Sequence, residues 1–114
     1  MKSVTRRILV QLGLSPKYHG YHAIVEAVDT IAKNPGIKTT ALYTIVANKI
    51  GSTCSRVERN IRHAVSVVLT RGDLDLMRRI FGYNITPDGN IYPGDFLACL
   101  TMYVQEVHSN ALEV

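Results

Sequence analysis

The sequence predicts an all-α fold: one six-helix domain over residues 1–114, with a helix-turn-helix at about residues 40–71. Apolar residues recur at helical spacing in successive segments, and short stretches rich in glycine, proline or asparagine separate these segments. A basic amphipathic segment follows one of the glycine turns. The 114 residues, 46% of them hydrophobic and 19% charged, suffice for one modest core.

The first two helices are expected at about residues 4–12 and 18–33. Ser3 is the candidate N-cap of the first helix, and Gly13 would end it. Pro16 opens the second region, and an Asn-Pro-Gly segment breaks its helix at the far end. The apolar stripe of this second helix consists of Ile24, Val28 and Ile31.

The next two helices form the predicted helix-turn-helix. Thr39 and Thr40 are cap candidates for the shorter helix, and the turn is Gly51-Ser52. Thr53 is a plausible N-cap for the second helix, which would run to about Thr70. The residues of the shorter helix expected to face the core are Leu42, Ile45, Val46 and Ile50.

Two further helices complete the domain. Asp73 would cap a fifth helix over residues 74–81, and residues 83–93 read as an exposed loop or short hairpin. The sixth helix is expected at about residues 95–108. Its broad apolar stripe packs inward, or part of it meets a second copy of the chain; core packing is favoured. The stripe consists of Phe96, Leu97, Leu100, Tyr103, Val104 and Val107.

The fourth helix separates into two faces when wound at about 100° per residue. An apolar face suits burial in a core. The opposite face carries three guanidiniums, which are planar groups suited to phosphates and guanine edges. The apolar face holds Val57, Ile61, Ala64, Val65 and Val68, and the polar face holds Ser55, Arg56, Arg59, Arg62, His63, Ser66 and Thr70.

The charge distribution favours a polyanionic partner. The chain carries a net charge of +4, and residues 38–71 hold six Lys and Arg against Glu58 alone. The C-terminal third is acidic, so the basic charge is concentrated on the helix-turn-helix. A membrane surface would require larger apolar side chains opposite the cations than this helix offers. Double-stranded DNA is therefore the expected partner, and Lys49 and Arg71 are expected to contact phosphates.

Enzyme chemistry is not expected. The sequence has no phosphate loop, nucleophile elbow, HExxH or paired-cysteine motif, and nothing implies a cofactor, a metal or a small-molecule substrate. His19 and His22 are spaced for a shared ligand but lack further donors, so a surface pair is expected. Cys54 and Cys99 do not form a disulfide framework. No apolar run approaches a membrane span, and a cytoplasmic location is expected.

The fourth helix reads SRVERNIRHA at residues 55–64, and Thr70-Arg71-Gly72 follows it. This pattern closely resembles the reading helix of the DNA-binding effector domain of the stage zero sporulation protein A family. The resemblance covers roughly residues 3–108. It extends to LGLSPKYHGY at 12–21, Leu42-Tyr43, IVANK at 45–49, Phe81-Gly82-Tyr83 and Phe96.

The resemblance implies a transcription regulator of the response-regulator class. The family joins a phosphoacceptor receiver to this all-helical domain and binds short TGTCGAA-like boxes through the major groove, often as tandem copies. Only the effector domain is matched here, so the sequence corresponds to a fragment or to a stand-alone effector. The family's DNA contacts would fall on Ser55, Arg56, Glu58, Arg59, Arg62 and His63.

Several positions depart from the family pattern. Cys54 and Asn60 stand where the family tends to have alanine, and Ser66 stands where an acidic residue is common. Thr44 replaces a proline and Leu69 an aromatic residue. These changes flank the arginines of the reading helix, which are retained. The alternative is an interaction module without DNA binding, which would use its sixth helix to pair with a full-length regulator.

Overall fold

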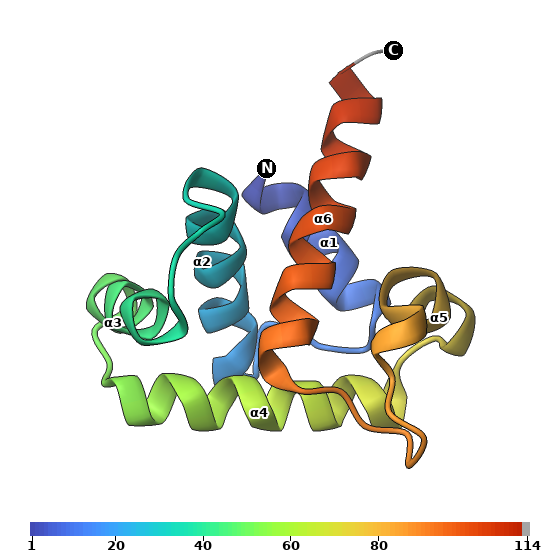
Figure 1. Ribbon diagram of the computed structural model, residues 1–114, viewed down its shortest axis with the longest axis horizontal. Helices are drawn as coiled ribbons and strands as arrows, with labels where there is room; N and C mark the ends of the chain where they lie inside the picture. The colour runs from blue at the N-terminus through green and yellow to red at the C-terminus, as the bar shows by residue number, and fades with distance from the viewer. Residues whose placement is uncertain (113–114) are drawn as a thin grey trace.

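A computed structural model describes residues 1–112, and the described part of the chain contains helices and no strands. The predicted all-α fold with six helices is confirmed (Figure 1). A short 3-10 turn, Gly82–Asn84, follows the fifth helix. The helices are α1 Lys2–Gln11, α2 His19–Lys33, α3 Thr39–Ile50, α4 Cys54–Arg71, α5 Leu74–Phe81 and α6 Pro93–Leu112.

Helix α2 is the centre of the fold, since it packs against α1, α3, α4 and α6. Helix α4 lies across one end of the molecule, with α3, α2 and α6 on one side of it (Figure 1). Phe81 and Phe96 stack at 4.8 Å between ring centroids and join α5 to α6. One core therefore holds all six helices, and it leaves the opposite side of α4 exposed.

The close approach of α2 to α4 depends on Gly20. A Cβ atom at this position would lie 2.3 Å from the Asn60 carbonyl oxygen and 2.6 Å from the Ala64 Cβ. A side chain would therefore push the two helices apart. Gly20 sets how closely the start of α2 lies beside the middle of α4.

The predicted core of α3 is partly wrong. Leu42 and Val46 are buried, but Ile45 is exposed and Ile50 only partly buried, while Tyr43 and Ala47 are buried. Helix α3 packs against both α2 and α4. Its buried surface is therefore turned toward the groove between two helices, which a single stripe does not describe.

Two predicted caps are also wrong. Helix α1 begins at Lys2 and α3 at Thr39, so Ser3 and both threonines of α3 lie inside the first helical turns. The N-cap residues are Met1 and Lys38, and neither caps through its side chain. The helices extend one or two residues further than the cap signals suggest.

Helix α6 is longer than predicted at both ends. Pro93 occupies its first position, where the missing N–H of proline leaves no hydrogen bond unmade. The stripe packs inward as expected, with Phe96, Leu97, Leu100 and Val104 buried. Tyr103 and Val107 are partly buried against the core. Residues 85–92, before α6, form a loop with a tight turn at 86–90. Among residues 1–112, no helix combines the length and the apolar composition needed to cross a membrane.

Candidate nucleic-acid interface

The two predicted faces of α4 are confirmed. Val57, Ile61, Ala64, Val65 and Val68 are buried to 97% or more. All seven polar residues from Ser55 to Thr70 on the opposite face are exposed. The apolar face anchors α4 to the core, so the polar face is presented to the solvent in one fixed orientation.

The turn before α4 has the conformation that its sequence predicts. Gly51 ends α3 with φ 67° and ψ 42°, a left-handed conformation that favours glycine. The Thr53 hydroxyl caps α4 by accepting a hydrogen bond from the Arg56 backbone N–H at 3.2 Å. The turn and the cap together define where α4 starts and therefore which way its first-turn side chains point.

The three arginines of the polar face differ in their surroundings. Arg62 forms an ion pair with Glu58, one turn earlier, at 2.5 Å. Arg56 and Arg59 form no ion pair with any residue that the structure describes. The N-terminal half of α4 thus presents two guanidiniums with their donors free for an external acceptor.

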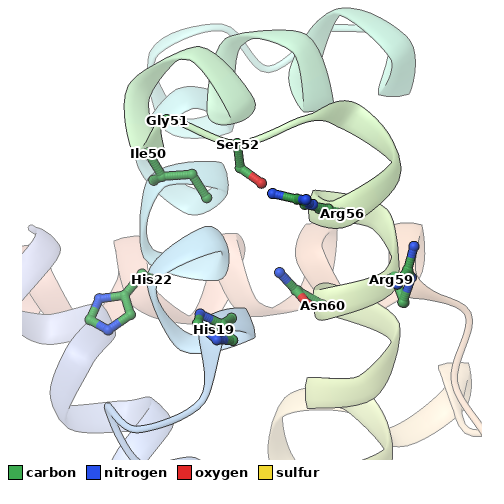
Figure 2. A pocket seen from close by; sticks show the side chains of 8 residues that line it. All are labelled: His19, His22, Ile50, Gly51, Ser52, Arg56, Arg59 and Asn60. Carbon is green, nitrogen blue, oxygen red and sulfur yellow. The ribbon is translucent and has the colours of Figure 1, made fainter.

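Arg56 borders a hollow between the turn and the start of α2. Figure 2 shows the side chains of Arg56 and Asn60 on the side of α4 that faces α2. His19 lies below them on α2, and the hollow measures about 660 Å³. It is lined by His19, His22, Ile50, Gly51, Ser52, Arg56, Arg59 and Asn60.

The histidine pair of α2 lies at the start of that helix and lines the hollow. His22 Nε2 lies 2.9 Å from the Pro16 carbonyl oxygen, which ties the ring to its own loop. Among residues 1–112, no three His, Cys, Asp or Glu side chains converge as ligands for a metal ion. His19 is exposed beside the hollow, so it faces the same solvent region as Arg56.

Of the two predicted phosphate contacts, Lys49 lies in the last turn of α3, and Arg71 lies at the C-terminal end of α4. Lys49 Nζ lies 3.9 Å from Glu26 Oε2, and the other oxygen of that carboxylate binds Lys2 at 3.0 Å. Arg71 Nη1 donates a hydrogen bond to the Tyr18 hydroxyl at 3.1 Å. The charge of Lys49 is thus partly offset within the chain, whereas Arg71 contacts a neutral group.

Tyr43 connects the Glu58–Arg62 pair to α3. Burial raises the pKa of the Tyr43 phenol, the negative charge of Glu58 raises it further, and Arg62 partly opposes them. The phenol therefore stays protonated and neutral at physiological pH. Tyr43 lines a hollow beside the Glu58–Arg62 pair, and the uncharged side chains of Thr39, Thr40 and Cys54 line it as well.

His19 is exposed as predicted, and the structure places both it and Tyr18 beside α4. The Tyr18 ring lies 6.0 Å from the ring of His63, although 45 positions separate them in the chain. No periodic pattern links residues so far apart. Only the packing of α2 against α4 brings them together.

A comparison with protein families decides the identity of this domain. The family described as "Sporulation initiation factor Spo0A C terminal" matches residues 5–104 of the 114-residue chain. The chain belongs to the Spo0A C-terminal domain family. The match begins in α1 and ends in α6, so it spans the whole core and the exposed face of α4.

The resemblance inferred from SRVERNIRHA is thereby confirmed. Domains of the Spo0A C-terminal family bind DNA in sporulation regulators, and the family is a regulatory one rather than a family of enzymes. In this chain, the guanidiniums of Arg56 and Arg59 lie on the exposed face of α4, the second helix of the helix-turn-helix, and form no ion pair among residues 1–112.

Proposed function

We propose that this chain is a sequence-specific transcription regulator that reads TGTCGAA-like boxes by inserting α4 into the major groove of DNA. The observation that carries the proposal is the exposed pair Arg56 and Arg59, which have no carboxylate partner among residues 1–112. A helix fits the major groove, and an arginine can bind guanine through two hydrogen bonds. In helix-turn-helix proteins the N-terminal part of the second helix contacts the bases, which is where both arginines lie.

The remaining residues of α4 support these two. Glu58 holds the Arg62 guanidinium at 2.5 Å, so we assign Glu58 mainly to orienting Arg62 rather than to contacting a cytosine. Ser55 and His63 complete the polar face. Lys49 and Arg71 flank it at either end and bind phosphates, which position the protein without reading sequence.

The test is a titration of the chain into a labelled duplex with one TGTCGAA-like box, against a scrambled duplex of equal length and salt. Fluorescence anisotropy should show tighter binding to the box. Equal binding to both duplexes would mean that α4 is a charged surface without sequence readout. Absence of binding even at low salt would favour the interaction module, which would then be sought by copurification with a full-length regulator.

A further inference from the structure

The flank of α4 next to α2 carries a cluster of hydrogen-bond donors that combines residues of α4 with residues of the loop before α2. The cluster consists of Lys17 and Tyr18 from the α1–α2 loop and of His63 and Arg71 from α4. Lys17 Nζ lies 5.4 Å from the centre of the Tyr18 ring, and Arg71 donates to the Tyr18 hydroxyl at 3.1 Å. A shallow hollow at this place is lined by Tyr18, His63, Ser66, Val67, Thr70 and Arg71.

The chemistry of this flank cluster suits a phosphate. No carboxylate lines the hollow, and neither Lys17 nor Arg71 forms an ion pair within residues 1–112. The Tyr18 hydroxyl accepts from Arg71, so its own proton remains available to donate. The Arg71 guanidinium and the Tyr18 hydroxyl border the hollow, and the Lys17 ammonium lies 5.4 Å from the centre of the Tyr18 ring, outside the lining of the hollow. Charge-assisted hydrogen bonds to phosphate are strong.

The flank cluster lies too far along α4 from Arg59 to contact the same bases. Arg71 lies twelve residues after Arg59, which corresponds to about 18 Å along the helix axis. A residue so far from the helix N-terminus meets the sugar-phosphate backbone when the first turns are in the groove. The opposite flank of α4 is less suited to phosphate, since Glu58 neutralises Arg62 there and Asp88 borders the same side.

We propose that Lys17, Tyr18 and Arg71 form a binding site for a phosphate of the DNA backbone just outside the box that α4 reads. This inference rests on the proposed function and extends its interface to the α1–α2 loop. Tyr18 orients the Arg71 guanidinium and supports the Lys17 ammonium on its ring face. His63 borders the same hollow and adds a further donor.

The experiment uses the full chain, a box duplex with flanking sequence and a scrambled duplex, titrated over a series of salt concentrations. Lys17→Ala and Arg71→Ala should each weaken binding to both duplexes by the same factor, roughly two- to five-fold. Each should also lower the log–log salt slope, by at most about 0.9, because the phosphate loses one of the two cations that neutralise it. Tyr18→Phe keeps the ring but loses the hydroxyl, so binding should weaken while the slope stays unchanged.

Arg6→Ala is the matched control. Arg6 is exposed and unpaired among the described residues, and Figure 1 shows the N-terminal half of α1 far from α4. Its loss should leave the salt slope unchanged. Trimming the duplex to the box alone should weaken the wild type more than it weakens Lys17→Ala, because the variant has already lost one of the cations that contact the phosphate. Circular dichroism melting should show unchanged stability for Lys17→Ala, Arg71→Ala and Arg6→Ala, whose side chains are exposed, and for Tyr18→Phe, which keeps the partly buried ring.

The outcomes separate this inference from the proposed function. If the wild type prefers the box while Lys17→Ala and Arg71→Ala behave like Arg6→Ala, the phosphate site is wrong and sequence reading stands. A loss confined to the box duplex would also overturn the site, since a backbone contact cannot depend on base sequence. A wild type that binds neither duplex would overturn the proposed function and the site together.

Discussion

Arg59 and Arg62 are neighbours on the polar face of α4, yet only one of them has a fixed partner. Glu58 holds Arg62 in an exposed ion pair, and such pairs contribute little to stability. The pair instead restricts where the Arg62 guanidinium can point. Arg59 lacks a carboxylate partner among the described residues, so it can bind a guanine without first breaking an ion pair.

Arg59→Ala should distinguish sequence reading from general attraction to DNA. A two-hydrogen-bond contact from arginine to guanine contributes about 1–3 kcal/mol of discrimination. The variant should lose roughly that much affinity for the TGTCGAA-like box and retain nearly all of its affinity for scrambled DNA. Anisotropy titrations with both duplexes measure this. An equal loss on both would show that Arg59 contributes only charge.

The two cysteines should differ in reactivity. Cys54 is exposed, whereas Cys99 is partly buried. Burial raises the pKa of the Cys99 thiol, Asp95 raises it further, and a hydrogen bond from Asn84 partly opposes both. Because the thiolate is the nucleophile, iodoacetamide at neutral pH should modify Cys54 first, as mass spectrometry would show. Faster modification of Cys99 would contradict the buried position of its thiol.

At the scale of single helices, the start of α4 is specified by the residues next to it. Its N-cap is made by a side chain, whereas α1, α2 and α3 begin without one. Gly51 immediately before it ends α3 in the left-handed conformation. The helix that presents the arginines therefore starts at a defined residue.

Thr53→Ala should destabilise the protein by about 0.5–2 kcal/mol, because the Arg56 backbone N–H loses its hydrogen-bond partner. Urea denaturation monitored by circular dichroism gives the free energy of unfolding. Thr39→Ala is the matched control, since Thr39 lies inside α3 and makes no capping hydrogen bond. A loss of similar size in both variants would show that the Thr53 cap has no special role.

The contact between α2 and α4 makes a second prediction at this scale. Gly20→Ala places a methyl group 2.3 Å from the Asn60 carbonyl oxygen, so the helices must separate. We expect a loss of about 1–3 kcal/mol in the free energy of unfolding, as for other overpacked sites. Gly36→Ala is the control, because no atom lies within 4 Å of its added methyl group and stability should not fall. Unchanged stability of Gly20→Ala would refute the close packing.

At the scale of the whole molecule, charge is separated along the chain. Residues 38–71 are strongly basic and the C-terminal third is acidic. Binding to DNA should therefore weaken steeply with salt, with a slope of about 0.9 per phosphate contact between 50 and 200 mM salt. A salt series on a single-box duplex measures the slope. A flat response would contradict an electrostatic interface on α4.

Two copies should occupy adjacent boxes, while the free chain should be monomeric or weakly associating. Met102 on α6 and Val10 on α1 are 71% and 53% exposed, which leaves apolar surface that the core does not cover. Sedimentation of the chain alone and with a two-box duplex tests this. A tight dimer without DNA would contradict it.

Much of the fold could be predicted from local patterns. The helices of the helix-turn-helix, the Gly51 turn, the Thr53 cap and the Asp73 cap each depend on a few neighbouring residues, and the structure confirms them. The buried face of α3 could not be predicted from the sequence, because it depends on how α2 and α4 pack against this helix. Ile45 faces outward for this reason, although it fits the helical stripe.

The sequence by itself determined the all-α class, the two faces of α4 and the family, because these depend on residue order within short segments. Only the tertiary structure decided which cations remain available. It pairs Lys49 with Glu26 across α3 and α2, and it brings Tyr18 to Arg71. Such pairings join residues far apart in the chain, so they depend on helix packing that no local pattern encodes.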